Sequence, residues 1–498
     1  MIVLLGRDGY TAHIHRGKAN GFVGVHIWRP ASKFQHVNQP SSLAKLRTRF
    51  DAFRMKNASE AEIRERQQRR LQELLHFVLR NSRFYKRLYD DIDRPITTLD
   101  SLPPVTKSQL MEHFDSVVTD TAVELDDVAD FTGATATLGE RFLGRYPVWM
   151  TSGTTGEPGI FLQDDWSKTA TDAVRVRWAL SALFDLQTIK RLIRHKGKIA
   201  EIAVGGGHFA GASGVEIFRK EHRRLQDRIR LVSPDQPLSE VIAELNEYQP
   251  AVLIGYATVL LELERKQRSG QLKLSPAYIA PTGEPITSEE KDRLRTTFGA
   301  SVREIYGATE FYGIGVECER GNVHVNTDWV ILEPVDADYQ PVDPGEPSET
   351  VLVTNLANRI QPLVRYDLGD SVTMYEERCP CGSAFPVIEV EGRQGEVLHF
   401  ETDEGKEIPI FPLALTSVVE ETPGVRRSQI VKTGSKRLRI RLEFEEKFDE
   451  ESVWKTVENE LSDFFATQGV GDISIEQATE APARDSQSGK FRHVWSEA

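Results

Sequence analysis

A run of nine residues alternates hydroxyl side chains with glycines in a way that suits phosphate binding. It reads Thr151-Ser152-Gly153-Thr154-Thr155-Gly156-Glu157-Pro158-Gly159. Glycines allow backbone N–H groups to approach an anion closely, and the hydroxyl groups donate further hydrogen bonds. The run lacks the Gly-x-x-x-x-Gly-Lys-Ser/Thr spacing of a P-loop. On composition alone, a surface loop rich in Gly, Ser and Thr is the competing interpretation.

All three cysteines of the chain, together with one histidine, form a set of candidate metal ligands. Cys318 precedes His324 by six residues, and a single residue separates Cys379 from Cys381. Two such pairs supply four ligands, which suits tetrahedral zinc. With four protein ligands the site would be closed and therefore structural. Because the Cys-x-Cys spacing is tighter than usual, three unrelated reduced thiols are the alternative.

Short apolar runs alternate with helical stretches between residues 146 and 370. Buried strands are expected at the runs that Gly or Pro terminates, which are 199–204, 251–254, 278–280 and 302–306. Such alternation indicates an α/β fold whose ligand site lies beyond the carboxyl ends of the strands. We therefore expect a large α/β domain over residues 59–391.

After Gly392 the pattern changes to that of a smaller α+β domain. A half-exposed strand is expected at 438–444, where apolar and polar residues alternate strictly. A helix is expected at 453–464, and another strand around Ile473 and Ile475. Residues 392–498 thus have the size and composition of a compact domain.

The first 58 residues are rich in Lys, Arg and His and show no convincing period, so we interpret them as a basic extension of unknown role. Ser59 and Glu62 have the spacing of a capping box, which predicts a helix that ends near Asn81. The apolar start of the chain is cut short at Arg7 and Asp8, which argues against a signal peptide.

Composition limits the classes of function. A chain of 498 residues favours two or more domains. Its net charge of -13 argues against a general nucleic-acid binder, which needs a basic surface. No apolar run approaches the length needed to cross a bilayer, so no membrane partner is expected. With only three cysteines, a reducing, cytoplasmic location is expected.

The Thr151–Gly159 run resembles the phosphate loop of the adenylate-forming superfamily, which comprises acyl-CoA synthetases, luciferases and peptide-synthetase adenylation domains. Four further segments resemble motifs of that superfamily in the same order, and they are Tyr306-Gly307-Ala308-Thr309-Glu310, Arg365-Tyr366-Asp367-Leu368-Gly369-Asp370, Gly392-Arg393 and Ser488-Gly489-Lys490. Five motifs in order make chance a poor explanation. The spelling Cys379-Pro380-Cys381-Gly382 ahead of Glu391-Gly392-Arg393 resembles the phenylacetate–CoA ligase branch, some members of which carry zinc.

This resemblance, which spans about Ser59 to the end, implies layered sheets in the large domain and a mobile C-terminal lid. It implies that ATP binds at residues of the motifs, which are Thr151, Ser152, Gly153, Thr154, Thr155, Gly156, Gly283, Glu284, Tyr306, Gly307, Asp370 and Arg393. Asp370 would accept the ribose hydroxyls, and it matches the motif better than Asp367 does. Arg393 would reach the ribose or the phosphates.

The resemblance also implies the groups that carry the chemistry. Glu310 would hold Mg²⁺, and Thr309 would donate to the α-phosphate. Lys490 would stabilise the charge that develops in the transition state once the lid closes. One departure is that Gly159 occupies a position where many phosphate loops of the superfamily carry lysine.

Two further segments carry weaker resemblances. Residues 205–211 lack a dinucleotide fingerprint and resemble instead a His-x-x-Gly segment, which implies that His208 lines the acyl pocket. A structural histidine is the alternative. Thr282-Gly283-Glu284-Pro285 resembles an adenine-contacting turn. Phe209, Tyr256 and Tyr312 are candidates for an aromatic pocket, although aromatics fill cores equally well.

The implied reaction joins a carboxylic acid, aryl or another small organic acid, to AMP with release of pyrophosphate and then transfers the acyl group to coenzyme A. An amine, a carrier protein or a reductase are the alternative acceptors. A nucleotide-binding scaffold without catalysis is less favoured, because Glu310, Asp370, Arg393 and Lys490 are all present. A homodimer is a possible assembly.

Overall fold

The computed structural model describes residues 12–16, 23–27, 41–151, 159–179, 185–205, 207–390, 394–395, 397–402, 407–420, 422–444, 448–471, 473–483 and 492–497. It forms two compact units, Met1–Gln39 and Pro40–Ala498. In the smaller unit, strand β1 (Ala12–Arg16) pairs with β2 (Val23–Ile27) in an antiparallel hairpin.

The basic extension expected over residues 1–58 is shorter in the structure, because helix α1 (Ser42–Met55) belongs to the larger unit. This helix packs along α7 (Asp165–Ala179). Ala52 and Met55 are buried, and Arg177 Nε donates a 2.8 Å hydrogen bond to the Ala52 carbonyl. The inward face of α1 therefore belongs to the core of the larger unit.

Helix α2 (Glu60–Asn81) confirms the predicted capping box and the predicted end of the helix. Ser59 N donates to Glu62 Oε2 at 2.9 Å, and Glu62 N donates to Ser59 Oγ at 3.3 Å. Four short helices follow in the chain, and they are α3 (Arg83–Leu88), α4 (Lys107–Glu112), α5 (Phe114–Val117) and α6 (Leu125–Gly133). A 3-10 turn, η1 (Thr135–Thr137), comes after α6.

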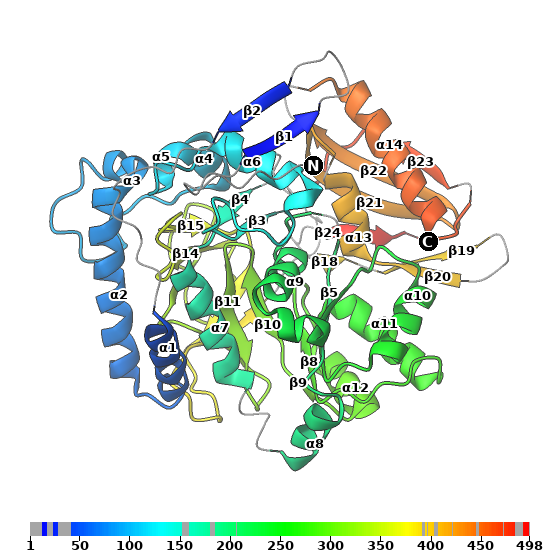
Figure 1. Cartoon of the computed structure of the whole chain (residues 1–498), viewed down its shortest axis with the longest axis horizontal. Coiled ribbons are helices and arrows are strands. Elements are labelled where there is room, and N and C mark those ends of the chain that lie inside the picture. Colours follow the sequence, from blue (N-terminus) through cyan, green and yellow to red (C-terminus); the bar gives the residue numbers. More distant parts are fainter. Residues whose placement is uncertain are drawn as a thin grey trace. The chain divides into compact units, whose positions relative to one another are not determined.

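A five-stranded parallel sheet confirms the predicted α/β pattern. Its order is β6-β5-β7-β8-β9, and its strands are β5 (Ile199–Ile202), β6 (Ile229–Val232), β7 (Val252–Gly255), β8 (Tyr278–Pro281) and β9 (Ser301–Val302). The connecting helices are α8 (Leu186–Arg194), α9 (Ala210–Glu221), α10 (Leu238–Tyr248), α11 (Ala257–Arg268) and α12 (Ser288–Phe298), with the 3-10 segment η3 (Arg223–Arg228). Leucines of α10, α11 and α12 form one apolar core with Ala200 and Ile202 of β5. Figure 1 shows these helices beside the parallel sheet.

Antiparallel sheets lie beside the parallel one, so the large domain is layered. One has the order β10-β11-β12-β17-β16, with β10 (Ile305–Ala308), β11 (Phe311–Glu317), β12 (Val323–Val325), β16 (Val372–Tyr375) and β17 (Val387–Val390). Another joins β13 (Val330–Val335), β14 (Thr350–Asn355) and β15 (Tyr366–Asp367), and a hairpin joins β3 (Val148–Met150) and β4 (Ile160–Leu162).

The C-terminal segment contains its own sheet and its own apolar core. The sheet order is β18-β24-β21-β22-β23, with β18 (Gln394–Gly395), β21 (Val425–Gly434), β22 (Arg437–Phe444), β23 (Ser474–Gln477) and β24 (Arg492–Ser496). A hairpin of β19 (Leu398–Glu401) and β20 (Glu407–Ile410) and the helices α13 (Pro412–Glu420) and α14 (Glu450–Thr467) complete it (Figure 1). The strands predicted at 438–444 and around 473–475 and the helix predicted at 453–464 are confirmed.

The C-terminal segment contacts the parallel-sheet region in this structure. Phe411 and Ala414 lie in the same apolar cluster as α10 and α12, and Gln468 donates a hydrogen bond to the Asp235 carbonyl. None of the described helices is both long and apolar enough to span a membrane.

Candidate active site

The carboxyl ends of the parallel strands meet at one edge of the sheet, where an α/β fold places its ligand. Tyr256, which follows β7, accepts a hydrogen bond at its hydroxyl from Val204 N at 3.4 Å. Ser233 Oγ donates to Asp235 Oδ2 at 2.6 Å, and Gly205 N donates to the same oxygen at 3.4 Å. These contacts join the ends of β5, β6 and β7, so the expected ligand edge is formed.

The base of the phosphate loop is closed by two hydrogen bonds between Thr151 and Gly159. Thr151 N donates to the Gly159 carbonyl at 2.9 Å, and Gly159 N donates to Thr151 Oγ1 at 2.8 Å. Met150 N donates to the His208 carbonyl at 2.9 Å, which ties the loop base to the segment after β5. The predicted ligands Ser152, Gly153, Thr154, Thr155 and Gly156 lie outside the described residues.

Thr309 and Glu310 form the turn between β10 and β11. The Glu310 carbonyl accepts from Gln163 Nε2 at 3.2 Å and from Asn355 Nδ2 at 3.3 Å, so the turn is fixed from two sides. Its carboxylate is buried and accepts from the Tyr366 hydroxyl at 2.8 Å. Burial raises the pKa of the Glu310 carboxyl, and the Tyr366 hydrogen bond opposes that shift. A nearby cation would stabilise the ionised form, and a carboxylate is a suitable hard ligand for Mg²⁺.

Lys107 is a cation of this region that the sequence did not identify. A Cβ atom on Gly159 would lie only 3.1 Å from Lys107 Cδ, so the lysine stem runs beside the end of the phosphate loop. The positive charge of Lys107 also lowers the pKa of Glu310. Lys107 thus lies near the position where Gly159 replaces a loop lysine. The sequence signals here only a helix start, through the capping box of Thr106 and Gln109.

Asp370 and Asp367 have different surroundings, although they belong to the same motif. Asp367 accepts from the Tyr339 hydroxyl at 2.8 Å, from Thr350 Oγ1 at 2.5 Å and from Gly369 N at 3.2 Å. Asp370 Oδ2 accepts from the Tyr306 hydroxyl at 3.0 Å. The Asp367 carboxylate is therefore committed to folding the motif, and Asp370 is the better candidate for the ribose.

In the Thr282–Pro285 turn, which was predicted to contact adenine, the Glu284 carboxylate bonds to the start of a helix. Gly283 has a φ of +77°, and a Cβ there would lie 3.1 Å from the Tyr256 ring, so glycine is required. Glu284 accepts from Thr258 N and Thr258 Oγ1, both at 2.8 Å, at the start of α11. Burial raises the pKa of Glu284 to about 7. This carboxylate holds a helix end, which leaves the backbone of the turn to contact a base.

His208 is buried, and its environment favours the structural alternative. Its Nε2 lies 3.0 Å from Thr137 Oγ1, and its ring centroid is 5.2 Å from that of Phe131. Burial lowers the pKa of His208, which favours the neutral imidazole. Its ring is thus packed against α6 and η1, while its carbonyl holds the loop base. Arg393 and Lys490 lie outside the described residues.

The four candidate zinc ligands come together as predicted. Their ligand atoms, from Cys318, His324, Cys379 and Cys381, all lie within 4.8 Å of one another. Cys318 Sγ is 3.6 Å from Cys379 Sγ, and Cys381 Sγ is 3.4 Å from His324 Nε2. Tetrahedral zinc with Zn–S bonds of about 2.3 Å separates its ligand atoms by roughly 3.8 Å. The cluster therefore has suitable dimensions for zinc.

The surroundings of this cluster also fit a metal site. His324 Nδ1 lies 2.8 Å from the Phe385 carbonyl, which directs Nε2 toward the cysteines. The backbone N–H groups of Arg320 and Ser383 donate to Cys318 Sγ and Cys381 Sγ at 3.3 and 3.4 Å. Such donors favour thiolates, the form that binds zinc.

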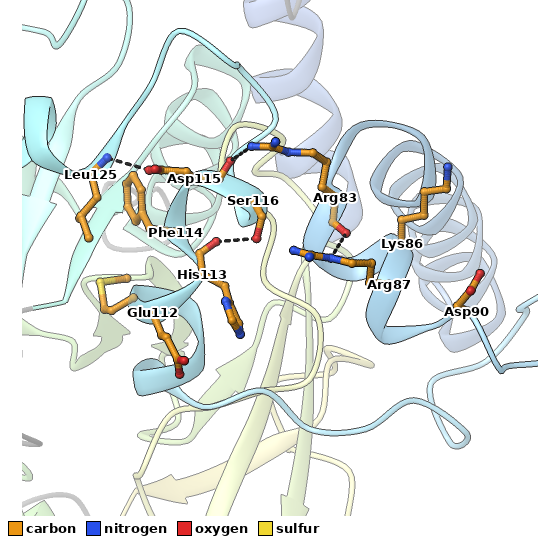
Figure 2. Close-up of a pocket in the computed structure, with 11 residues that line it drawn as sticks. Arg83, Lys86, Arg87, Asp90, Glu112, His113, Phe114, Asp115, Ser116 and Leu125 are labelled. Carbon is orange, nitrogen blue, oxygen red and sulfur yellow. Dashed lines mark hydrogen bonds between the residues drawn. The ribbon is translucent and has the colours of Figure 1, made fainter.

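A groove of about 560 Å³ lies apart from these motifs, between α3 and the α4–α5 segment (Figure 2). Several of its polar groups bond to one another. Arg83 donates to the Asp115 carbonyl at 2.8 Å, and Leu125 N donates to Asp115 Oδ1 at 2.8 Å. None of the predicted site residues lines this groove, so it is not the candidate active site.

Sequence comparison finds proteins that are similar to this chain. The chain is 26% identical over 384 residues to a phenylacetate-coenzyme A ligase of Thermus thermophilus, and the match covers 73% of this chain and 76% of that enzyme. It is 23% identical over 323 residues to protein CapK of Staphylococcus aureus, with 63% of each chain covered. No protein-family model matches the chain.

Solved structures show the same fold. A crystal structure of 2-hydroxyisobutyryl-CoA ligase in complex with 2-HIB-AMP and CoA, in the thioesterification state, superposes with a TM-score of 0.53 at 18% identity. That match covers 94% of this chain and 96% of the ligase. An open conformation of the same ligase gives a TM-score of 0.50, at 18% identity, with 94% and 98% covered. The predicted α/β fold with a second, smaller domain is confirmed at the level of the fold.

Proposed function

We propose that this chain, a phenylacetate–CoA ligase-like protein of the adenylate-forming kind, activates a carboxylic acid with ATP and transfers the acyl group to coenzyme A. One observation carries the proposal. The Tyr306–Glu310 and Arg365–Asp370 segments are linked by two side-chain hydrogen bonds, Tyr366 to Glu310 and Tyr306 to Asp370. Lys107 connects this pair of segments to the base of the phosphate loop.

The first half-reaction joins two anions, so charge neutralisation and positioning are the main demands on the protein. A substrate carboxylate oxygen attacks the α-phosphorus of ATP, the bond to the β-phosphate oxygen breaks, and pyrophosphate leaves. Lys107 supplies positive charge beside the loop, and Thr309 donates to the α-phosphate. Glu310 would hold Mg²⁺, which neutralises phosphate charge when bound. Lys490 completes the arrangement from the C-terminal domain.

The nucleotide is held by groups at the carboxyl edge of the parallel sheet. Asp370 accepts the ribose hydroxyls, and the backbone of the Gly283 turn contacts the adenine. Arg393, at the start of the C-terminal domain, reaches the ribose or the phosphates. His208 supports the loop base through its carbonyl, and this contact is its main contribution to the site.

In the second half-reaction, the thiol of coenzyme A attacks the acyl carbonyl and AMP leaves. The C-terminal domain acts as a lid over the site. The alternative final acceptor is an amine, a carrier protein or a reductase, because the residues of the nucleotide site do not distinguish between these acceptors and coenzyme A. A scaffold that has lost catalysis is disfavoured by the buried, supported Glu310 carboxylate.

The cysteine cluster is assigned a structural zinc ion. Cys318, His324, Cys379 and Cys381 would hold it with all four positions occupied by protein. Such an ion supplies folding energy by cross-linking the β11–β12 hairpin to the segment before β17.

The test is acid-dependent exchange of labelled pyrophosphate into ATP over a panel of carboxylic acids, followed by product analysis with and without coenzyme A. We expect exchange with at least one acid, and an acyl-CoA thioester when coenzyme A is present. Glu310→Gln should abolish exchange, whereas Glu240→Gln, an exposed carboxylate on α10, should leave it intact. Cleavage of ATP to ADP and phosphate would contradict the adenylate mechanism.

A further inference from the structure

A glutamate occupies the middle of a strand that is otherwise apolar. Ala200 and Ile202 of β5 point into the apolar core with α10 and α12. Since side chains alternate along a strand, Glu201 lies on the opposite face. A Cβ on Gly211 of α9 would lie 3.5 Å from Glu201 Oε1 and 2.7 Å from the Ala203 Cβ. A glycine in the first turn of α9 therefore leaves room for this carboxylate.

An arginine and a tyrosine lie close to Glu201. The guanidinium carbon of Arg175, on α7, lies 4.9 Å from the ring centroid of Tyr312, on β11. Burial and then the charge of Glu201 raise the pKa of Tyr312 to about 12, and the Arg175 charge and the Thr282 side chain oppose this rise. The Arg175 charge in turn lowers the pKa of Glu201, which burial raises. Polar groups from β5, α7, β11 and the residue that follows β8 therefore form one cluster.

The opposite charges in this cluster do not pair with each other. Within the part of the chain that the structure describes, the side chains of Glu201 and Arg175 form no ion pair and no hydrogen bond, and the Arg175 guanidinium contacts only the Tyr312 ring face. An unpaired charge inside a protein is costly, so neighbouring buried charges normally pair directly. Glu201, Arg175 and Tyr312 nevertheless remain partly accessible. The two charged side chains are therefore available to a small polar group.

This space adjoins the candidate active site. Tyr312 is two residues beyond Glu310, and a Cβ on Gly307 would lie 3.0 Å from the Tyr312 backbone. Thr282 immediately precedes the Gly283 turn. Glu201 lies four residues before Gly205 at the ligand edge, which corresponds to roughly 13 Å of strand. An acid whose carboxylate reaches the phosphate loop would extend inward, toward Glu201 and Arg175.

We propose that Glu201, Arg175 and Tyr312 form the inner end of the acyl pocket and select a carboxylic acid that carries a hydroxyl group at the end remote from its carboxylate. This inference rests on the proposed function, because it assigns the substrate class of the same site. A hydroxyl group donates to the Glu201 carboxylate and at the same time accepts from the Arg175 guanidinium. An ammonium group satisfies only Glu201 and is repelled by Arg175.

An acid without this hydroxyl group leaves both charged side chains without a hydrogen-bond partner. A site built to bind a substrate hydroxyl rejects the analogue that lacks it, by as much as about 10⁴-fold. The unhydroxylated acid is therefore the poorer substrate, even where its hydrocarbon part fits equally well.

The experiment compares matched pairs of acids, each with and without a remote hydroxyl group. Suitable pairs are para-hydroxyphenylacetate with phenylacetate, para-hydroxybenzoate with benzoate, and omega-hydroxyhexanoate with hexanoate. From kcat/KM for pyrophosphate release, we expect the hydroxylated member of the best pair to be preferred by at least about 100-fold. Glu201→Gln should reduce that preference by roughly tenfold or more, and Glu201→Leu should reverse it. Tyr312→Phe, which retains the ring, should reduce it less than Glu201→Leu.

Folding of the variants is checked by the rise in melting temperature on addition of ATP, which should match that of the wild type. Glu240→Gln serves as the surface control and should keep the full preference. If the wild type activates both members of every pair equally well, the polar subsite is overturned while adenylation stands. If no acid of a broad panel supports pyrophosphate exchange, the proposed function fails first.

Discussion

The Tyr366 hydroxyl donates a hydrogen bond to Glu310 Oε1 at 2.8 Å, across 56 residues of sequence. A second bond runs between the same two segments, from the Tyr306 hydroxyl to Asp370 Oδ2 at 3.0 Å. Each segment thus contributes a tyrosine that orients the acid of the other. This reciprocal arrangement couples the group assigned to Mg²⁺ with the group assigned to the ribose, and it leads to the first prediction.

Tyr366→Phe should weaken the use of Mg²⁺ without abolishing activity. The variant removes the hydroxyl that orients Glu310, and a hydrogen bond to a charged group contributes about 1.5–3 kcal/mol. We expect the Mg²⁺ concentration for half-maximal pyrophosphate exchange to rise by roughly tenfold. Tyr339→Phe, which removes a hydroxyl bound to Asp367, is the matched control and should leave the Mg²⁺ dependence unchanged. Equal Mg²⁺ dependence in Tyr366→Phe and wild type would argue against Glu310 as the ligand.

Lys107→Met should slow adenylation, because a preorganised positive charge beside the phosphates is lost. Removing one such group typically costs about 100-fold in rate. Lys107→Arg should retain part of the rate, since the charge remains. Lys86→Met, at an exposed lysine of α3 (Figure 2), is the control and should behave as wild type. The rate of acid-dependent pyrophosphate exchange is the measurement, and a normal rate in Lys107→Met would exclude the assigned role.

Purified protein should contain about one zinc ion per chain, and Cys379→Ser should lower both zinc content and melting temperature. The reason is that metal binding and folding share the same free energy. Ser383→Ala leaves all four ligands in place and should retain the metal. Metal analysis of freshly purified, unchelated protein provides the test. The assignment is abandoned if wild-type protein carries no zinc.

The Glu284 carboxyl should make stability depend on pH. Its pKa is raised from its ordinary value of 4.5 to about 7, chiefly by burial. A raised pKa means that the folded state binds this proton more tightly than the unfolded state does. The contribution of the protonated carboxyl to folding stability is therefore complete below pH 4.5 and is lost as pH rises through 7. Glu284→Gln mimics the protonated form. The melting temperature of the variant minus that of the wild type should therefore increase by a few degrees as pH rises from 5 to 8.

Glu240→Gln, at an exposed carboxylate, provides the control for this comparison. Its melting temperature should follow that of the wild type over the same range. A constant difference between Glu284→Gln and wild type at every pH would show that the carboxyl is ionised throughout.

Local sequence patterns correctly predicted three strands of the parallel sheet and the start of one helix. The runs at 199–204, 251–254 and 278–280 became β5, β7 and β8, because strands of a parallel sheet are buried on both faces. The capping box at Ser59 and Glu62 located the start of α2. By contrast, α1 was not predicted, because it lies in a basic segment and buries only a small face, which contains Thr48, Ala52 and Met55.

The candidate site was predicted where residue types mark it in the sequence, and it was missed where only the packing of the chain brings groups together. The four candidate zinc ligands were identified because cysteine is rare in this chain, and the structure brings their ligand atoms together. Lys107 was missed because its approach to Gly159 depends on how α4 packs, which no local pattern encodes. Glu284 was assigned to the nucleotide site by resemblance, and no local pattern indicated that its carboxylate accepts hydrogen bonds from Thr258 at the start of α11. Tertiary packing decided both cases.

Lys490→Ala and Asp370→Ala should separate the lid from the nucleotide site. If Lys490 reaches the reacting atoms only when the C-terminal domain closes, its loss removes an interaction made mainly in the transition state. Pyrophosphate exchange should then slow by roughly 100- to 1000-fold, while the dissociation constant for ATP changes little. Asp370→Ala should instead weaken ATP binding, because the ribose hydroxyls lose their acceptor in the ground state.

The second half-reaction distinguishes a specific role of Lys490 from general damage to the protein. Supplied with pre-formed acyl-adenylate and coenzyme A, Lys490→Ala should still form the thioester, because the bond at the α-phosphorus has already been made. Lys436→Ala, which removes a lysine from the turn between β21 and β22 of the same domain, should leave both half-reactions intact. If Lys490→Ala adenylates at the wild-type rate, Lys490 has no part in the chemistry. If Lys490→Ala loses both half-reactions equally, Lys490 contributes to the fold of the C-terminal domain. In that case another residue must supply the positive charge that the lid brings to the site.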